Sequence, residues 1–485
     1  MQQFQEFFFT QFQQEVTIDI QEKVLERTIS LPKTFFDSVK SGYLVSRLRN
    51  DVQWIQWFFS GTLVQFAAQL CKFVGSVAFL FYLEWRIALP VILTVPITWL
   101  IASYLSAKTY ILSHHAMESH AEVSGNFQEC FSNVPLIKGF TREIDTIGKL
   151  IQGLRQIHSI GLEQQSLNGL IQLSINAVPG FAKLLVMGFG SYLVVKDTWT
   201  LGSLLAFIAY LDYVYAPAKF LASSQHQFQR SRAALQRVVS LLHMIPEVNI
   251  DSGEIMARPV KRVEFRGVVF SYNRQKIVLD GVSFSANAGQ KVTILGPSGS
   301  GKTTFISLLL RFYQPTEGEI LFNGRPAREL ETRSIRASFG YVPQENLLFS
   351  GTIIENLIYG NSAATHEQVE RAARTAGIQD FIVSLRDGYQ TKVGERGVTL
   401  SEGQKQRLSI ARALVPDPDI LILDEPTSAL DLPTAHEILT SLSRSAANKI
   451  LFIVTHRPDA MEESDLLIEL DAGGRVKVRE SGKIV

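Results

Sequence analysis

The sequence predicts a multidomain fold in which an all-α, membrane-spanning part is followed by an α/β part built on a parallel sheet. The first half contains four apolar windows long enough to cross a bilayer. In the second half, a strand-like run enters a glycine-rich loop at Gly296, and an apolar helical run leaves it. A further run of four apolar residues ends in two adjacent carboxylates, Asp424 and Glu425.

Composition excludes several classes of protein. The chain has 485 residues, and its mean hydropathy is slightly positive at +0.11 although 19% of residues are charged. A net charge of +1 argues against a general attraction to nucleic acid. Cys71 and Cys130 form no CxxC pair, so neither a disulfide framework nor a zinc site is indicated. The first residues lack the basic region and cleavage site of a signal peptide.

The four apolar windows are expected to be transmembrane helices. They lie at 58–83, 87–106, 168–195 and 201–222. Buried helices of a large soluble protein are the alternative, which accounts for one such window more easily than for four. Basic residues concentrate before the first window and between the second and third, whereas the other connections are short and nearly neutral. The positive-inside rule therefore places both termini in the cytosol.

Two further patterns complete the domain plan. Apolar residues recur at every fourth position from Phe4 to Val24, which predicts a helix that lies on the membrane or packs against others, and we favour packing. A polar stretch rich in proline and glycine then marks a boundary. We expect a transmembrane domain at 1–245, a linker at 246–261 and a second domain at 262–485.

The glycine-rich loop in VTILGPSGSGKTTFISLLL matches the pattern G-x-x-x-x-G-K-[ST] through Gly296, Gly301, Lys302 and Thr303. Such a match arises by chance in roughly 2% of chains of this length at average residue usage. Glycines let successive N–H groups converge on phosphate oxygens, and the helix N-terminus adds positive potential. Lys302 is expected to reach the β- and γ-phosphates and Thr303 to hold Mg²⁺.

The run DILILDEPTSALD is expected to form the neighbouring strand. Four buried-type residues precede Asp424 and Glu425, and open α/β sheets bind ligands at the carboxyl ends of their strands. Asp424 is the expected Mg²⁺ partner, and Glu425 is expected to polarise an attacking water. A solvated acidic pair in a loop is the alternative, which the apolar strand and the phosphate loop disfavour. The second half is thus expected to bind and hydrolyse a nucleoside triphosphate.

Other segments stand in order around these motifs: VVFSYNRQKIVLDGVSFSANAG before the loop, then YVPQENLLFSGTIIENLIYG, TKVGERG, TSALD and IVTHR. The first half adds LPKTFFDSVKSGYLVSRLRNDV and NVPLIKGFTREID. With these segments, nearly the whole chain resembles an ABC exporter half-transporter. The resemblance implies a transmembrane domain of that type, followed by a P-loop domain with an antiparallel β subdomain and a helical subdomain. It also implies ATP and Mg²⁺ as cofactors, and export across the cytoplasmic membrane with the nucleotide-binding domain in the cytosol.

The resemblance also implies roles for single residues. Tyr272 would stack on adenine, Asp431 would lie in a dimer-contacting loop, and Glu395 is the centre of the segment before the signature. The implied catalytic residues are Glu425, His456 and Gln344. The implied nucleotide-binding residues are Tyr272, Gly296, Ser298, Gly299, Ser300, Gly301, Lys302, Thr303, Thr304 and Asp424. The implied Mg²⁺ contacts are Thr303, Gln344 and Asp424. Taken singly, a tyrosine, glutamine or histidine of this kind is more often an ordinary strand, loop or core residue, but their order favours these roles.

The stretch LSEGQ at 400–404 has the features of a second anion site, because a flexible glycine lies at a helix start. In the resembled family it is the signature motif, which caps the ATP held by the opposite subunit. Ser401, Gly403 and Gln404 are the implied contacts, so the chain is expected to work as a dimer with an identical or a different half-transporter. The commonest family form is LSGGQ, so Glu402 is a departure whose carboxylate would repel a triphosphate unless it points away.

The match also exposes a gap. In the family the first cytosolic loop follows the second of six spans, whereas here Met1 falls near the cytosolic end of that span. We expect a misassigned start or a fragment rather than a true four-span exporter. A non-transporting regulatory or degenerate subunit that binds ATP in a heterodimer is the alternative function. A soluble ABC protein acting on ribosomes or DNA is disfavoured by the apolar windows.

Ionisable residues interrupt the windows, and Lys72, Lys183 and Asp212 lie deep within them. At ~1.5 Å per residue, each lies about 17–20 Å from the outer end of its window, near the bilayer centre. Charges at that depth normally face a cavity or one another. An ion pair of Asp212 with one lysine is the alternative. The other lysine would then remain unpaired, so the cavity would carry a net positive charge at this depth. The exported molecule, which is otherwise unidentified, is therefore expected to be an amphiphile with an anionic group; membrane lipid is the other expected contact.

Overall fold

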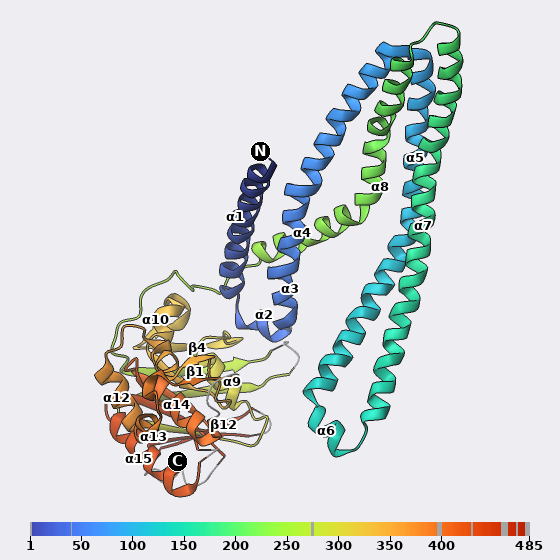
Figure 1. Ribbon diagram of the computed structural model, residues 1–485. Helices are drawn as coiled ribbons and strands as arrows, with labels where there is room; N and C mark the ends of the chain where they lie inside the picture. The colour runs from blue at the N-terminus through green and yellow to red at the C-terminus, as the bar shows by residue number, and fades with distance from the viewer. Residues whose placement is uncertain are drawn as a thin grey trace. The chain divides into compact units, whose positions relative to one another are not determined.

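The computed structural model describes residues 2–39, 41–272, 276–394, 400–427, 430–456, 464–471 and 474–480. The chain divides into two compact units, which are both visible in Figure 1. The first unit comprises Met1–Ile29 and Ser41–Met244, and the second comprises Ser30–Lys40 and Ile245–Val485.

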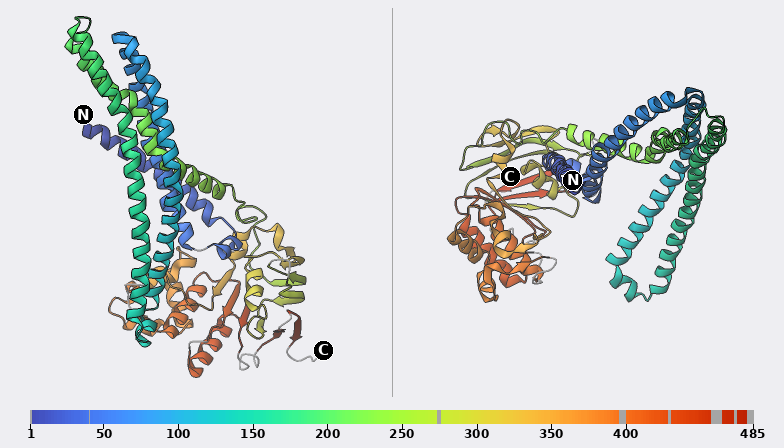
Figure 2. Two further views of the ribbon diagram at one scale, coloured as in Figure 1. Left: turned by 90° about the vertical axis from the view of Figure 1, so that its right-hand side faces the viewer. Right: turned by 45° about the horizontal axis from the view of Figure 1, so that its top comes forward.

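The first unit is built of helices, as the apolar windows predict. Its described elements are α1 (Gln2–Ile29), α3 (Ser41–Ser46), η1 (Arg47–Asp51), α4 (Val52–Gln56), η2 (Trp57–Thr62), α5 (Leu63–Ser132), α6 (Val134–Gly139), α7 (Glu143–Val195) and α8 (Leu201–His243). Glu84 interrupts α5 with extended backbone angles (φ −166°, ψ 98°), and the chain turns back between two arms of this helix (Figure 1). The second arm of α5 and α7 run side by side in both views of Figure 2, with α6 joining them.

Three stretches of the described helices are long and apolar enough to cross a membrane: Gly42–Ile101, Glu143–Val195 and Leu201–Leu221. The first stretch contains the first predicted window and the part of the second up to Ile101, because it includes the first arm of α5 and the start of the second arm beyond Glu84. The four windows thus lie in three helical stretches. Their common core lies where α5, α7 and α8 meet, and it includes Leu80, Val186 and Phe207.

The helix predicted from Phe4 to Val24 is present as part of α1, but only its second half packs as expected. Val24 is fully buried beside Ile55 of α4 and Val238 of α8. By contrast, Phe4 and Phe12 are mostly exposed. The four-residue spacing therefore predicts the helix correctly, whereas the packing prediction is wrong for its first turns, since no described element reaches them.

Among the described residues, the second unit forms three sheets. A four-stranded antiparallel sheet has the order β2-β1-β4-β5, a six-stranded sheet has the order β12-β11-β3-β10-β9-β6, and β7 pairs with β8. In the six-stranded sheet all strands are parallel except the edge strand β12. The strands are β1 (Arg262–Phe270), β2 (Leu279–Asn287), β3 (Lys291–Leu295), β4 (Glu317–Phe322), β5 (Arg325–Pro326), β6 (Phe339–Val342), β7 (Gly351–Thr352), β8 (Lys392–Val393), β9 (Ile420–Asp424), β10 (Ile450–Val454), β11 (Leu466–Leu470) and β12 (Val476–Glu480).

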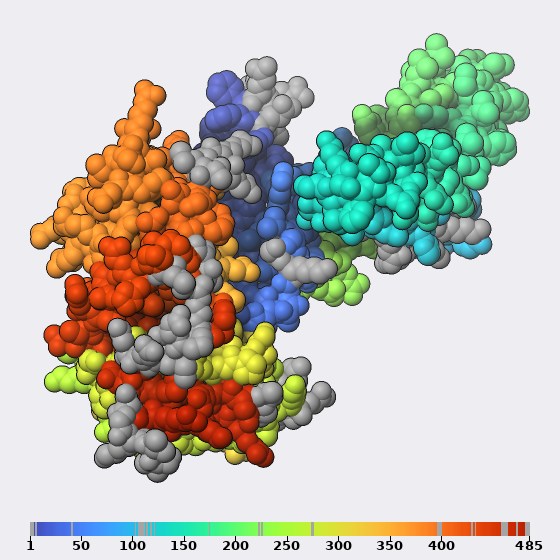
Figure 3. Space-filling view, turned by 90° about the horizontal axis from the view of Figure 1, so that it is seen from below, coloured from blue at the N-terminus to red at the C-terminus, as the bar shows by residue number. Residues whose placement is uncertain are grey.

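Helices cover the six-stranded sheet. Every residue of β9 and β10 is buried, which is the pattern that parallel strands covered on both faces require. Phe265 of the antiparallel sheet stacks on Phe305 of α9, with ring centroids 4.9 Å apart, and so fixes the helix that follows the glycine loop. In Figure 3, the orange segment that includes α12 and α13 forms a separate lobe beside the sheets. The helices are α2 (Lys33–Ser38), α9 (Lys302–Leu309), η3 (Ala327–Glu329), α10 (Thr332–Arg336), α11 (Ile353–Leu357), η4 (Ile358–Gly360), α12 (His366–Thr375), α13 (Gln379–Ser384), η5 (Gly388–Gln390), α14 (Glu402–Leu414) and α15 (Leu432–Ser445).

The second unit includes two segments that the sequence places elsewhere. Met256 and Val260, from the expected linker 246–261, are buried in the core of this unit, so the segment packs as part of the domain rather than as a free connection. The short helix α2, expected within the transmembrane domain, also clusters with this unit. The hydroxyl of Tyr313 donates a hydrogen bond to the carboxylate of Asp37 in α2, which is one contact that holds α2 there.

Candidate functional site

The glycine-rich loop lies between β3 and α9, as its pattern predicts. Gly301 has a left-handed backbone (φ 101°) at the position just before α9, where other residues would be strained. A Cβ on Gly296 would lie 2.3 Å from Ser300 Oγ and 2.7 Å from the carbonyl oxygen of Leu470. Ser298 and Gly299 are exposed in the middle of the loop. Only glycine can therefore keep this loop compact at both of its ends.

The polar atoms of the loop fit an anionic ligand. Ser300 is buried, and its Oγ has no hydrogen-bond partner among the described residues. Buried hydroxyls normally have a partner, so this one is suited to a ligand oxygen. Lys302 Nζ donates to the carbonyl oxygens of Gly296 and Pro297 at 2.7 and 2.9 Å, which keeps the ammonium at the loop. Thr303 is exposed at the start of α9, whereas Thr304 is buried.

Two carboxylates end the strand β9. Asp424 is only 6% exposed. Burial and the neighbouring Glu425 raise the pKa of Asp424 to about 6, although the ammonium of Lys302 opposes this rise. A buried carboxylate beside a second carboxylate and below a phosphate loop has the oxygen donors that a divalent cation prefers. Asp424 therefore lies where the sequence predicts the Mg²⁺ partner.

The parallel strands bring the three predicted catalytic side chains together. Gln344 follows β6, Glu425 follows β9 and His456 follows β10, and these strands are direct neighbours in the order β10-β9-β6. Gln344 Nε2 lies 3.3 Å from Glu425 Oε2, and His456 Nδ1 lies 3.2 Å from Glu425 Oε1. Since a carboxylate only accepts hydrogen bonds, the His456 tautomer that this contact requires carries its proton on Nδ1. Glu425 is thus the centre of the group.

The backbone of Glu425 is held by a residue that the sequence interpretation missed. Glu425 has a left-handed conformation (φ 51°), which is uncommon for a residue other than glycine. Its N–H donates to the carbonyl oxygen of Val454 at 2.9 Å, and its carbonyl oxygen accepts from Gln406 Nε2 at 3.0 Å. Gln406 is buried on the inner face of α14, in helical phase with Ile410. A polar residue in phase with buried apolar residues is the signal that could have identified it.

The LSEGQ stretch forms the N-terminus of α14. Ser401 Oγ accepts from the Gln404 N–H, and the Gln404 side chain accepts from the Ser401 N–H, which together make a capping box. The first N–H groups of this helix therefore point outward beside Gly403. The Glu402 carboxylate lies 2.7 Å from Lys405 Nζ, so its charge is partly neutralised within the same helix. This ion pair reduces the repulsion that the Glu402 carboxylate is expected to exert on a triphosphate.

The other predicted nucleotide-site residues have defined partners where they are described. The half-exposed ring of Tyr272 lies edge-on to Tyr313, with centroids 5.1 Å apart, and its hydroxyl lies 2.8 Å from Thr304 Oγ1. Asp431 caps α15 by accepting from the Thr434 N–H. Glu395 and part of the TSALD loop fall outside the described residues.

Lys72, Lys183 and Asp212 lie in the first unit, which we call the membrane unit, and they differ in their contacts. Lys183 Nζ and Asp212 Oδ2 form an ion pair at 2.7 Å. Lys72 instead lies near the ring of Tyr213, with its ammonium 5.9 Å from the ring centroid. No carboxylate of the described residues is within salt-bridge distance of Lys72. A cation–π contact contributes roughly 0.5–1 kcal/mol when exposed, which is less than the ~2.5–3.5 kcal/mol that a charge costs at the bilayer centre.

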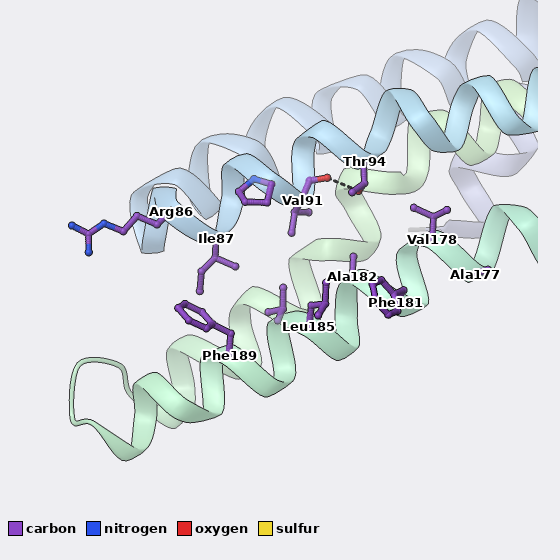
Figure 4. Close-up of a pocket in the computed structure, with 12 residues that line it drawn as sticks. Arg86, Ile87, Val91, Thr94, Ala177, Val178, Phe181, Ala182, Leu185 and Phe189 are labelled. Carbon is purple, nitrogen blue, oxygen red and sulfur yellow. Dashed lines mark hydrogen bonds between the residues drawn. The ribbon is translucent and has the colours of Figure 1, made fainter.

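The membrane unit also contains an apolar cavity. It has a volume of about 620 Å³ and lies between the second arm of α5 and α7. Figure 4 shows Ile87, Leu185 and Phe189 lining it, while the guanidinium of Arg86 points away from these side chains. The cavity therefore offers a ligand apolar contacts but no inward charge.

Comparisons with known proteins agree with this architecture. Residues 1–218 match the ABC transporter transmembrane region, and residues 279–428 match the ABC transporter domain. A relative in Bacillus subtilis, described as a putative multidrug export ATP-binding/permease protein, is 31% identical over 98% of this chain and 82% of its own length. The ATP-dependent lipid A-core flippase of Syntrophus aciditrophicus is 29% identical over 97% of this chain and 78% of its own.

A solved structure extends the likeness to three dimensions. The structure of a bacterial Atm1-family ABC exporter with ATP bound superposes with a TM-score of 0.88 and 28% identity, over 99% of this chain and 84% of that one. These matches confirm the resemblance inferred from the motifs. The chain belongs to the ABC exporters: it is a membrane-embedded half-transporter whose fused ATP-binding domain couples ATP hydrolysis to export.

Proposed function

We propose that this chain hydrolyses Mg²⁺-bound ATP at a site that a second half-transporter subunit completes, and that closure and reopening of this dimer drive export across the cytoplasmic membrane. One observation carries the proposal. Gln344, Glu425 and His456 converge at the carboxyl ends of three neighbouring parallel strands, whose sheet also carries the phosphate loop. This arrangement matches the requirements of phosphoryl transfer to water.

The residues of this chain would divide the work. The N–H groups of the loop 296–301 and Lys302 would hold the β- and γ-phosphates. Thr303, Asp424 and Gln344 would hold Mg²⁺, which when bound neutralises charge that develops on the phosphate oxygens. Tyr272 would stack on adenine. Two observations support these roles. The Ser300 hydroxyl has no hydrogen-bond partner among the described residues, and burial beside Glu425 raises the pKa of Asp424, so a nearby cation would stabilise its charged form.

Glu425 would accept the proton of the attacking water. Its carboxylate is oriented by Gln344 on one oxygen and by His456 on the other. His456 donates from Nδ1 to Glu425, and in its doubly protonated form it would also donate from Nε2 to the γ-phosphate. Because Gln344, Glu425 and His456 are all present and in contact, an active ATPase is favoured over the alternative of a non-transporting, degenerate subunit.

The capped N-terminus of α14 supports the role of the partner subunit. Ser401, the Gly403 N–H and Gln404 lie at the start of a helix of 13 residues, whose dipole attracts an anion. Asp431 would contribute to the dimer contact. A second copy of this chain and a different half-transporter both fit this surface.

The helix α2 would couple the two units mechanically. It belongs by contact to the nucleotide unit, yet the chain enters it from α1 and leaves it through α3, which both belong to the membrane unit. Burial and the hydrogen bond to Asp37 raise the pKa of Tyr313, so its hydroxyl stays protonated and donates. Because Tyr313 also contacts Tyr272, movement at the adenine position can reach α2 through one side chain.

The Glu425→Gln variant is expected to bind ATP normally and to release phosphate about 10²–10⁴ times more slowly, because an amide cannot accept the proton. A closed dimer should accumulate. Phosphate release and the molecular mass in detergent with and without ATP are the measurements. Undiminished phosphate release would show that another group is the base.

The Gln406→Leu variant is expected to lower the ATP turnover number by roughly tenfold, since one lost hydrogen bond to a buried carbonyl group corresponds to about 1–3 kcal/mol. The KM for ATP should change less than twofold, because the hydrogen bond that is lost holds the backbone of Glu425 and not a phosphate- or Mg²⁺-binding side chain. Steady-state ATPase assays give both constants, and thermal unfolding shows whether the variant is folded. A raised KM with an unchanged turnover number would contradict the positioning role.

The apparent affinity for Mg²⁺ should depend on pH through Asp424. Below the Asp424 pKa of about 6, a proton must leave before the cation binds. The apparent dissociation constant should therefore rise up to about tenfold per pH unit below pH 6 and level off above about pH 7. Titrations of Mg²⁺-dependent ATP binding at buffered free Mg²⁺ test this, because binding can be followed without hydrolysis. Asp424→Asn is the control, because protonation of ATP itself affects both proteins alike, and an equal pH slope in both would exclude Asp424.

The Tyr313→Phe variant keeps the aromatic contacts but loses the hydrogen bond to Asp37. Basal ATPase activity in detergent should stay within about twofold, and the stimulation on reconstitution into lipid vesicles should fall. Asp37→Asn is the matched partner variant. Combining the two should add little to either, since both remove one interaction. Fully additive losses would mean that the two residues act separately.

A further inference from the structure

The ion pair between Lys183 and Asp212 leaves Lys72 as the cation of these three residues without a carboxylate partner among the described residues. At 2.7 Å, Lys183 and Asp212 satisfy each other between α7 and α8. Lys72, on the first arm of α5, has its ammonium 5.9 Å from the ring centroid of Tyr213. An ammonium group near the bilayer centre requires an anion or water, because neither lipid tails nor one ring compensates its charge.

The surroundings of Lys72 form a small pocket of mixed character. It has a volume of about 350 Å³ between the first arm of α5 and α8, and we name it the Lys72 pocket; it is lined by Lys72, Gly75, Ser76, Phe79, Tyr210 and Tyr213. Phe79 and Tyr210 pack against each other with centroids 4.5 Å apart, which gives the pocket a firm aromatic wall. Two tyrosines and a lysine at the edge of an apolar surface can hold a group that is anionic at one end and apolar at the other.

We propose that the Lys72 pocket binds the exported molecule, and that this molecule is an amphiphile with a phosphate or carboxylate group that pairs with the Lys72 ammonium. Its apolar part lies against Phe79 and the tyrosine rings. This inference rests on the proposed function as an exporter and assigns the substrate class of that same transport path. The cavity in Figure 4 does not compete for this role, because Arg86 points away from its apolar lining.

Charge complementarity is what distinguishes the Lys72 pocket from an ordinary lipid-facing surface. The described residues around it supply one positive charge and no negative one. Removing the charge of Lys72 should therefore weaken the binding of anionic amphiphiles specifically. Removing the Lys183–Asp212 pair takes away one charge of each sign and should leave the binding of these amphiphiles unchanged. The double variant Lys183→Gln/Asp212→Asn is thus a matched control within the same unit.

The test uses the full-length protein in detergent with three probes: dodecyl phosphate, its neutral analogue dodecyl maltoside, and inorganic phosphate. Binding is followed by thermal stabilisation and by stimulation of ATPase activity. In the wild type, dodecyl phosphate should act at concentrations about tenfold lower than the neutral amphiphile, and inorganic phosphate should be inert in both measurements. Lys72→Gln should abolish this preference, Lys72→Arg should keep it within about threefold, and the control double variant should keep it fully.

Charge reversal provides a gain of function. Lys72→Glu should bind dodecyltrimethylammonium in preference to dodecyl phosphate. An unchanged preference for dodecyl phosphate in Lys72→Gln, or an equal loss in the control double variant, would overturn the proposal. Equal stabilisation by inorganic phosphate would also overturn it, since a free anion would then suffice. Basal ATPase activity separates this failure from failure of the proposed function, because Lys72 takes no part in hydrolysis.

Discussion

The nucleotide site depends on the parallel register of β6, β9 and β10. Val342 is paired with Leu423, and Asp424 is paired with Val454, so the three strands end at the same level. One or two residues after each strand ends, the backbone reaches Gln344, Glu425 or His456, so these three side chains lie close together. A slip of one residue would turn side chains to the opposite face of the sheet. The strands β9 and β10 are buried on both faces, so such a slip would force every side chain to repack against the covering helices, and this cost disfavours it.

Glu425 joins this sheet to the helix that the partner subunit is proposed to contact. Its left-handed backbone is held between the carbonyl oxygen of Val454 and the amide of Gln406. Gln406 lies one turn into α14, the helix that Ser401 caps. One helix therefore connects the proposed trans contact to the proposed general base. In the proposed dimer, the position of this carboxylate would respond to nucleotide bound on either side of the interface.

In the membrane unit, the cost of placing charge among apolar helices organises the polar residues. Lys183 and Asp212 reduce this cost by pairing, while Lys72 lies beside aromatic rings at a small pocket. A separate feature is the position of α2. It lies between α1 and α3 in the chain, which both belong to the membrane unit, but its contacts are with the nucleotide unit. In the proposed coupling, α2 is joined to the membrane helices by the chain itself and to the nucleotide unit by its packing.

Features that depend on neighbouring residues can be predicted from the sequence alone. The glycine loop, the apolar strand before Asp424 and the long apolar windows are local patterns, and local geometry follows from them. The contacts between residues that are distant in sequence become visible only in the folded chain: Gln406 with the carbonyl group of Glu425, Tyr313 with Asp37, and Lys183 rather than Lys72 with Asp212. These contacts depend on helix rotation and strand register, which the packing of the whole domain sets and which no single stretch of sequence encodes.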